Sequence, residues 1–275
     1  MKYLTFALAV CLSPYCLADD TKTSDDKSKT VQSDSKSSMD KTRMMSSNHM
    51  IGNSVYNNRN EALGDINSLV VSKKGDIHFV IMGRGGVAGV GETEVVVPWK
   101  AINCECKIVD GEMHCKPRLD LTTAKFEKAP ALKTDEYAEL YDAGWLKTNA
   151  KFYSAEVPKS APKKGDLVCM HHVTDKTIIG SDRREVGQLD AVIVEAPAGK
   201  ARFAIIGRGG VAGVGESYVA VPYNELSFKK QDGEYAIHID ATESQVEGAT
   251  KVTPGEYPEL RLTSVTDRIE ESWKR

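Results

Sequence analysis

A glycine-rich segment that could hold a phosphate group occurs twice in this sequence. The decapeptide GRGGVAGVGE occupies residues 83–92 and returns at residues 207–216. Its first six letters match the loose dinucleotide-binding pattern GxGxxA, which requires a following helix whose N-terminal amides hold a pyrophosphate. Each copy instead leads into a proline-containing segment rich in β-branched residues, TEVVVPW or SYVAVPY, which predicts a strand. A Walker loop is also excluded, because glutamate and not lysine follows Gly91.

Backbone geometry explains these glycines better than phosphate binding does. Glycine adopts positive φ at little cost and lets two backbone segments approach closely, as a sharp corner between strands requires. We therefore interpret the glycines of both decapeptides as structural residues of a strand corner. They are Gly83, Gly85, Gly86, Gly89 and Gly91 in the first copy and Gly207, Gly209, Gly210, Gly213 and Gly215 in the second.

Four residues at matching places in the two copies are candidates for contact with a partner protein. They are Arg84, Arg208, Trp99 and Tyr223. Arginine and the large aromatic residues are enriched at protein interfaces, where the arginine fork pairs with carboxylates. In the more favoured alternative each arginine has a structural role and pairs with the glutamate of its own loop, Glu92 or Glu216.

The cysteines predict a disulfide. Cys104, Cys106, Cys115 and Cys169 lie beyond the N-terminal segment, and an even number favours disulfides in an exported protein. Asp110-Gly111 is a strong hairpin-turn signal, and counting back from it places Cys106 opposite Cys115 in a non-hydrogen-bonded pair. Their Cα atoms are then about 4.5 Å apart, within disulfide range. A second bridge between Cys104 and Cys169 is possible. Counted from its own turn, the second copy has Phe228 and Ile237 at the paired positions.

Metal-ligating residue types are present, but their spacing does not favour a metal site. CECKIVDGEMHC and CMHH contain adequate zinc ligands, yet neighbouring residues on a strand point to opposite faces. Met39, Met44, Met45 and Met50 beside His49 could bind copper(I), although a disordered linker is the favoured interpretation of that segment. No nucleophile elbow or HExxH helix occurs, so we assign no catalytic residue, no metal and no cofactor.

The decapeptides belong to a longer internal repeat. HFVIMGRGGVAGVGETEVVVPWKAI aligns without a gap with RFAIIGRGGVAGVGESYVAVPYNEL. The similarity extends upstream, where Gly64 corresponds to Gly187, and downstream to the pair DEYAEL and GEYPEL. Short strands separated by turn signals predict a small barrel or sandwich in each unit. Thr242 and Gln245 predict a capping box at a short helix that follows.

These segments resemble the PRC-barrel family, known from the H subunit of the photosynthetic reaction centre. The matching positions are Ile51, Gly52 and Val55; Gly64, Asp65 and Ile66; the loop glycines with Glu92; and Val97, Pro98 and Trp99. The second copy keeps the loop and Val221-Pro222, but has LVCMHHV in place of the Ile-Gly opening and Tyr223 in place of the tryptophan. The resemblance implies a small six-stranded antiparallel barrel that docks onto other macromolecules and has no catalytic role.

The expected fold is mainly β, with two tandem small antiparallel barrels and short helices in the connector and at the C-terminus. Tyr137, Leu140, Tyr141 and Trp145 lie close to helical spacing in the connector, and Val265, Ile269 and Trp273 form an apolar stripe at the end. The expected organisation is a signal peptide at 1–18, a disordered polar linker at 19–47, domain 1 at 48–132, a connector with a short helix at 133–164, domain 2 at 165–252 and a C-terminal segment with an amphipathic helix at 253–275.

The N-terminus predicts export from the cytoplasm. Lys2 precedes the short apolar run YLTFALAVCLSPYCLA, and small residues before Asp19 mark a cleavage site. A lipid anchor on Cys16 is the less favoured alternative. No later stretch is long and apolar enough to be a transmembrane span of the mature chain. The formal net charge of −3 gives no support for nucleic-acid binding.

Together these patterns predict a non-enzymatic periplasmic or cell-envelope protein that binds or scaffolds. Its tandem barrels would dock onto an envelope protein or onto a second copy of the chain. The alternative is a periplasmic carrier of copper, zinc or a small ligand.

Overall fold

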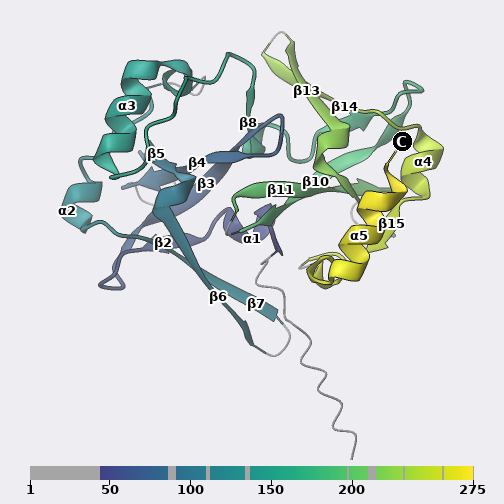
Figure 1. Ribbon diagram of the computed structural model, residues 1–275, viewed down its shortest axis with the longest axis horizontal. Coiled ribbons are helices and arrows are strands. Elements are labelled where there is room, and N and C mark those ends of the chain that lie inside the picture. The colour runs from purple at the N-terminus through teal and green to yellow at the C-terminus, as the bar shows by residue number, and fades with distance from the viewer. Residues whose placement is uncertain are drawn as a thin grey trace, which may run out of the picture. The chain divides into compact units, whose positions relative to one another are not determined.

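The computed structural model describes residues 44–85, 91–109, 112–133, 137–196, 198–209, 215–231, 233–255 and 257–274 (Figure 1). Several predictions fall outside these ranges and stay predictions. They concern the signal peptide, the linker up to residue 43, the turn Asp110-Gly111, and the central loop glycines Gly86, Gly89, Gly210 and Gly213.

The first half of the described chain is rich in short strands. Its elements are β1 (Met44–Ser46), α1 (Ser47–Met50), β2 (Ser54–Tyr56), β3 (Ala62–Ser72), β4 (Ile77–Arg84), β5 (Thr93–Pro98), the 3-10 helix η1 (Trp99–Ala101), β6 (Ile102–Val109), β7 (Glu112–Leu119), α2 (Thr123–Phe126), η2 (Ala138–Tyr141) and α3 (Ala143–Phe152).

The second half repeats this order. Its elements are β8 (Leu167–Cys169), η3 (Met170–His172), β9 (Thr177–Ile179), β10 (Glu185–Glu195), β11 (Lys200–Arg208), β12 (Ser217–Pro222), η4 (Tyr223–Glu225), β13 (Leu226–Gln231), β14 (Glu234–Ile239), α4 (Glu243–Glu247), β15 (Thr250–Val252), η5 (Pro258–Arg261) and α5 (Thr263–Ser272). The predicted capping box is present, since the Thr242 side chain accepts from the Gln245 amide and the Gln245 side chain accepts from Thr242.

The repeat is longer than the sequence alignment indicates. The helices η2 and α3 of the expected connector correspond to η5 and α5 of the expected C-terminal segment, and α3 and α5 have ten residues each. Tyr137 and Tyr257 precede the two 3-10 helices with φ of 53° and 48°. Each repeat therefore consists of a β-structure and its own pair of helices.

The two sheets share one strand order, to which the second adds the edge strand β15. In the first repeat the strand order is β5-β4-β3-β2-β7-β6, and in the second it is β15-β12-β11-β10-β9-β14-β13. The fold is mainly β, as predicted. It differs from a purely antiparallel arrangement in one parallel pairing per repeat, β2 with β7 and β9 with β14.

The two repeats exchange their first strands. β1 pairs with β10 of the second repeat, where Met45 lies opposite Val194, and β8 pairs with β3 of the first repeat, where Val168 lies opposite Val71. Figure 1 shows α1, which follows β1, beside β10. The expected linker is thus wrong over residues 44–47, and the expected second domain supplies a strand to the first sheet. Apolar burial explains the difference, because Met44 and Met45 are 7% and 5% exposed.

The helices cover the outer face of each sheet. Val70, Phe79 and Ile81 pack with Leu140 and Leu146 in the first repeat. Ile193 and Ile205 pack with Leu260, Val265 and Ile269 in the second, so the predicted C-terminal stripe is part of a core. A larger apolar cluster fills the interior and contains residues of both repeats. Within the described part of the chain, no helix is long and apolar enough to cross a membrane.

Candidate functional site

The described residues at the two ends of each glycine loop form a sharp corner between two strands. A Cβ atom on Gly83 would lie 1.7 Å from the Glu92 carboxylate, which folds back over it, and one on Gly64 would lie 1.9 Å from the Gly83 carbonyl oxygen. Gly207 and Gly187 repeat this arrangement. In the part of the chain that the structure describes, the elements that follow the two loops are strands β5 and β12, which is the order predicted for a strand corner and differs from the strand–helix order of a dinucleotide site.

The remaining described loop glycines have conformations that other residues rarely adopt. Gly85 and Gly91 have φ of 70° and 76°, and Gly209 and Gly215 have φ of 68° and 80°. No heavy atom lies within 4 Å of a Cβ built on any of the four, so their requirement is for backbone conformation and not for space.

Arg84 holds the end of a helix. Its guanidinium donates to the carbonyl oxygens of Phe126 and Ala129 at 3.2 and 3.0 Å, and its Nε lies 3.9 Å from Glu127. Its side chain is 15% exposed. The role is structural, but the partners are at the end of α2 and differ from the predicted Glu92, whose carboxylate accepts a hydrogen bond from Asn67.

Arg208 does not repeat these contacts. Its Nη1 is buried without a hydrogen-bond partner among the described residues. The matched arginines thus occupy equivalent strand ends but differ in their contacts, which the identical decapeptides do not reveal.

Trp99 and Tyr223 lie in the seam between the repeats. Their side chains are 6% and 1% exposed. A Cβ on Gly199 would lie 2.3 Å from the Trp99 Nε1, and one on Gly75 would lie 3.3 Å from the Tyr223 ring, so each aromatic residue packs on a turn of the opposite repeat. The Tyr223 ring therefore presents no surface to a separate partner, whereas the small exposed part of Trp99 belongs to the lining of a cleft. The identity of the contacting turns is not visible in the sequence.

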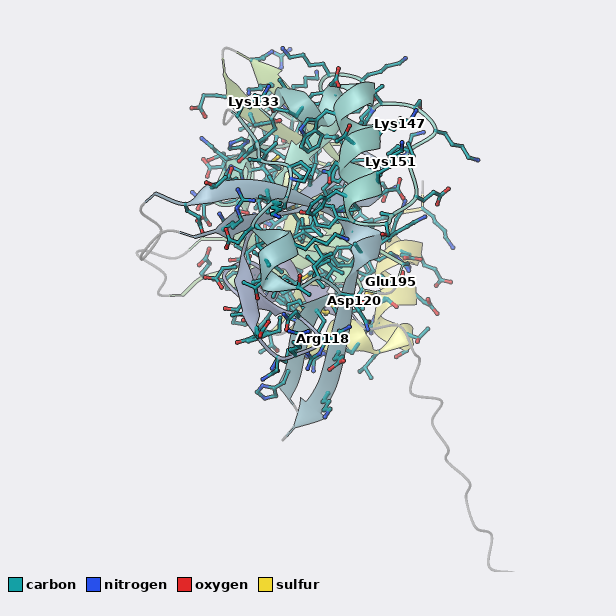
Figure 2. The ribbon with its side chains drawn as sticks, turned by 90° about the vertical axis from the view of Figure 1, so that its left-hand side faces the viewer. Arg118, Asp120, Lys133, Lys147, Lys151 and Glu195 are labelled. Carbon is teal, nitrogen blue, oxygen red and sulfur yellow. A yellow bond between two sulfur atoms is a disulfide. The ribbon has the colours of Figure 1, made fainter. Side chains whose placement is uncertain are left out.

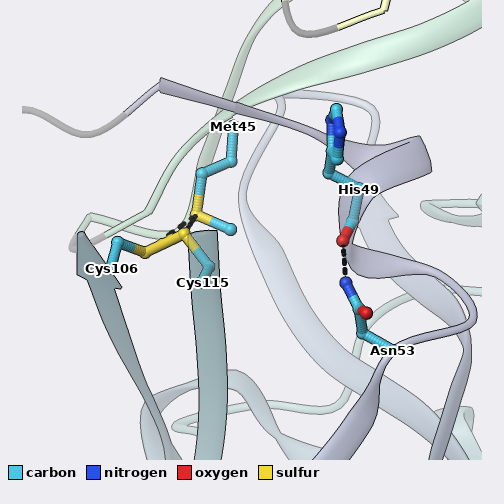
Figure 3. Close-up of a disulfide and its surroundings, with 5 residues drawn as sticks. All are labelled: Met45, His49, Asn53, Cys106 and Cys115. Carbon is cyan, nitrogen blue, oxygen red and sulfur yellow. Dashed lines mark hydrogen bonds between the residues drawn. A yellow bond between two sulfur atoms is a disulfide. The ribbon is translucent and has the colours of Figure 1, made fainter. Parts of the chain in front are cut away.

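The predicted disulfide between Cys106 and Cys115 is confirmed (Figure 3). Their Cα atoms are 4.0 Å apart, in agreement with a non-hydrogen-bonded cross-strand pair. The Met45 sulfur lies 3.7 and 3.6 Å from the two cysteine sulfurs, so the disulfide packs on the exchanged strand β1. Figure 3 also shows the His49 carbonyl accepting from the Asn53 side chain.

The possible second disulfide is not formed. Cys169 is buried in β8 against the outer-face cluster of the first repeat, whereas Cys104 lies on β6 beside the interior cluster. Burial raises the pKa of Cys169 to about 12, so its side chain stays a neutral thiol at physiological pH.

The hairpins of the two repeats differ in length. β6 and β7 have eight residues each, and β13 and β14 have six. Phe228 pairs with Ile237, and Cys104 pairs with Pro117. Measured from the start of each hairpin, Phe228 therefore corresponds to Cys104. The predicted correspondence with Cys106 holds only when the residues are counted from the turn.

The methionines do not form an open copper site. Met44, Met45 and Met50 are buried in packed elements, and Met39 lies outside the described residues. No group of three or more His, Cys, Asp or Glu side chains in the described part of the chain could hold a metal.

A ring stack that the sequence analysis missed joins the repeats. The Tyr137 ring stacks on His172 at 5.7 Å between centroids, and His172 stacks on Tyr235 at 6.0 Å. The Tyr137 hydroxyl lies 3.2 Å from both Glu94 Oε2 and His171 Nε2. Burial raises the pKa of Tyr235 to about 12, so the phenol is neutral. The stack connects the helical segment of one repeat to the hairpin of the other.

Sequence reasoning also missed a cleft of about 880 Å³. It lies between the first repeat, the segment after α3 and the β10–β11 turn of the second repeat. This volume falls within the range of known ligand pockets. The lining combines apolar and polar side chains. The apolar ones include Ile77, Phe79, Trp99, Leu146, Ala150 and Val157, and the polar ones are Asp76, His78, Lys100, Asn103, Glu156, Lys159 and Ser160. Val157 is one of two large apolar side chains more than a third exposed in the described residues.

The equivalent cleft in the second repeat is smaller. The cleft there is about 420 Å³. Arg202 crosses it, donating to Glu195 at 2.8 Å and to Glu270, and Trp273 stands beside it. The corresponding first-repeat residues are His78 at the position of Arg202 and Ala150 at the position of Glu270. Smaller, less charged residues therefore leave the first cleft open.

A family model described as PRC-barrel domain matches residues 43–121 and 170–246, which together make up more than half of the chain. No curated protein matches the chain significantly.

Proposed function

Because the chain belongs to the PRC-barrel family and contains two copies of its domain, we propose that it is a non-enzymatic docking protein that binds a partner protein through the open cleft of its first repeat. The two copies divide the roles. The second repeat completes the fold, and the first repeat supplies both structure and the contact site.

The contrast between the two clefts carries this proposal. Both repeats have the same strands and helices around the site, so the packing problem is the same in each. In the second repeat, the side chains of Arg202, Glu270 and Trp273 occupy part of this space. The first repeat leaves apolar surface exposed to solvent, which weakens folding unless a ligand or partner covers it. A cleft with exposed apolar side chains, retained at about twice the volume of its counterpart, is best explained by binding.

We propose an oxidising compartment outside the cytoplasm, the periplasm or cell envelope, as the site of action. The signal-like N-terminus and the Cys106–Cys115 disulfide support this location. Cell fractionation tests it, together with intact-mass measurement of the mature protein. A mature chain that begins at Asp19 and is found in the periplasmic or envelope fraction supports the proposal. An uncleaved chain in the cytoplasmic fraction contradicts it.

Docking is tested by filling the cleft with the residues that the second repeat has at the equivalent positions. The double variant His78→Arg/Ala150→Glu rebuilds the Arg202–Glu270 pair, and Val157→Asp places a charge at the exposed mouth with little effect on the core. The control is Lys151→Glu, because Lys151 is exposed on α3 (Figure 2) and is not among the residues that line the cleft.

Crosslinked envelope proteins captured on the wild-type chain and on the three variants are compared quantitatively. We expect at least one protein to be retained equally by wild type and Lys151→Glu and to fall by about tenfold with both cleft variants, at unchanged melting temperature. Equal capture by all four chains would show that the cleft is not the docking site.

The small-ligand carrier is the second candidate, favoured by the volume of the cleft. Native mass spectrometry of protein purified from its host distinguishes it from docking. A small molecule retained by the wild-type chain and lost from His78→Arg/Ala150→Glu supports the carrier.

A further inference from the structure

We propose that the partner docks as an extended acidic segment, which adds a strand to the outer edge of β6 and inserts one apolar side chain into the open cleft. This inference rests on the proposed docking function and specifies the chemistry of the partner. Three features of the first repeat support it, namely the sheet edge, the neighbouring cleft and the surrounding charges.

The strand β6 ends its sheet next to the cleft. It is the last strand in the order β5-β4-β3-β2-β7-β6 and pairs with β7 on its inner side. Ile102, Asn103 and Cys104 belong to β6 and also line the cleft. A strand added along β6 would therefore place alternate side chains directly over the cleft.

The backbone of β6 has the orientation that strand addition requires. The Cα atoms of Cys106 and Cys115 are 4.0 Å apart, the spacing of a non-hydrogen-bonded pair. The N–H and C=O groups of Cys106 therefore point away from β7 and toward the outer edge. Pro117, opposite Cys104, occupies a non-hydrogen-bonded position in the same alternation, so its missing N–H breaks no bond with β6.

The disulfide keeps this edge straight. It ties β6 to β7 at the middle of the hairpin, and Met45 packs against both sulfurs. Figure 1 shows the β6–β7 hairpin projecting from its sheet. An edge that is ordered before binding loses less conformational entropy when a partner strand pairs with it.

The charges around β6 and the cleft favour an acidic partner. The carboxylates there have partners, because Asp76 pairs with Lys200, Glu156 with Lys100 and Glu105 with Arg118. Lys107 on β6 and Lys159 at the cleft are exposed and have no ion pair within the described ranges. The remaining charge is therefore positive and complements acidic residues on either side of an apolar anchor.

The test uses fluorescein-labelled octapeptides that alternate threonine and glutamate around one central leucine. Their binding to the full-length mature protein is measured by fluorescence anisotropy. Three matched peptides carry glycine in place of leucine, lysine in place of glutamate, or N-methyl groups on alternate amides of one edge. N-methylation removes strand hydrogen bonds and leaves the side chains unchanged. We expect the leucine peptide to bind in the micromolar to millimolar range and each matched peptide to bind about tenfold more weakly.

Protein variants locate the site independently. We expect His78→Arg/Ala150→Glu, Val157→Asp and Lys107→Glu/Lys159→Glu each to weaken the leucine peptide about tenfold. Lys147→Glu/Lys151→Glu, which makes the same charge change on α3, should leave binding unchanged. Binding that is indifferent to N-methylation, or to both cleft variants, would overturn the inference.

The peptide result and the capture result separate the two proposals. If no octapeptide binds while envelope capture still depends on the cleft, the docking function stands and strand addition is wrong. If capture does not depend on the cleft, both proposals fail together.

Discussion

Gly199 of the second repeat lies against the indole ring of Trp99 in the first, so closely that a Cβ atom on Gly199 would stand 2.3 Å from the Trp99 Nε1. The reverse contact joins Gly75 to Tyr223, whose hydroxyl also donates to the Ser72 carbonyl oxygen at 3.4 Å. Each repeat thus contributes one turn glycine and one aromatic ring, and each glycine packs on the ring of the other repeat. The two repeats are therefore parts of one folding unit.

Gly199→Ala should destabilise the whole protein by about 2–4 kcal/mol. The added methyl group would overlap the indole, which costs about 1–3 kcal/mol, and the φ of 63° adds about 1 kcal/mol. Gly165→Ala is the matched control, because Gly165 has φ of 88° with nothing within 4 Å of its Cβ, and should cost about 1 kcal/mol. Urea denaturation measures both, and equal losses would contradict the seam contact.

Strand exchange predicts that a change in one repeat is felt in the other. Met45→Ala removes a side chain that is 5% exposed and should cost about 2–5 kcal/mol. Hydrogen exchange should quicken at Ile193 and Val194 of β10, which pair with β1. Val168→Ala changes the second repeat and should quicken hydrogen exchange in the first, at Val70 and Val71 of β3. Faster exchange confined to the mutated repeat would contradict the exchanged pairing.

The exchange itself could not be predicted from sequence. β1 and β8 occupy equivalent places in the repeat, so pairing within a repeat and pairing between repeats satisfy the same hydrophobic pattern. β1 is also only three residues long and follows a polar segment, which hides its burial. The strands around the decapeptides were predictable because β-branched runs and glycine corners are local features. The partner of a strand is a property of the whole chain.

The disulfide was predictable for a similar reason, since a two-residue turn fixes the register of the hairpin and hence the opposition of Cys106 and Cys115. The cleft was not. It depends on the difference between His78 and Arg202 together with that between Ala150 and Glu270, and these pairs come from separate segments. Only the fold shows that α3 and α5 are equivalent, and that α3 lies near the start of β4 as α5 lies near the start of β11.

Removing the disulfide should destabilise the chain by about 2–3 kcal/mol. The cross-link joins two residues with a sequence separation of 9 and limits the unfolded ensemble accordingly. Cys106→Ser/Cys115→Ser and chemical reduction of the wild type should give the same loss in urea denaturation. Cys104→Ser is the control and should leave the effect of reduction intact. A wild-type chain with no sensitivity to reductant would contradict the disulfide.

Arg84→Ala should cost about 2–4 kcal/mol, because two carbonyl oxygens at the end of α2 lose a charged donor. Arg208→Ala should cost less than about 1 kcal/mol, because the Arg208 Nη1 has no hydrogen-bond partner among the described residues. Thermal denaturation of the two variants gives the comparison directly. Equal losses would indicate that Arg208 makes equivalent contacts. A large loss of partner capture by a stable Arg84→Ala chain would restore the interface role.

His78 should make stability depend on pH. Burial lowers its pKa below the usual value near 6.5, although the Asp76 charge raises it. As pH falls below about 6.5, the unfolded chain therefore binds a proton that the folded chain resists, and the free energy of unfolding decreases until the folded pKa is passed. The contribution is fully present above pH 6.5 and is lost on the acid side.

His78→Gln removes this titration while keeping a polar side chain at the cleft. At pH 7.5 the imidazole is neutral in both the folded and the unfolded chain, so that pH provides the reference. Between pH 7.5 and pH 5.5 the wild-type chain should lose more stability in urea than His78→Gln, because every other titrating group is common to both. Parallel losses would show that the cleft leaves the histidine as well solvated as the unfolded chain does. The apolar side chains of Phe79 and Trp99, which line the cleft together with His78, predict the opposite result.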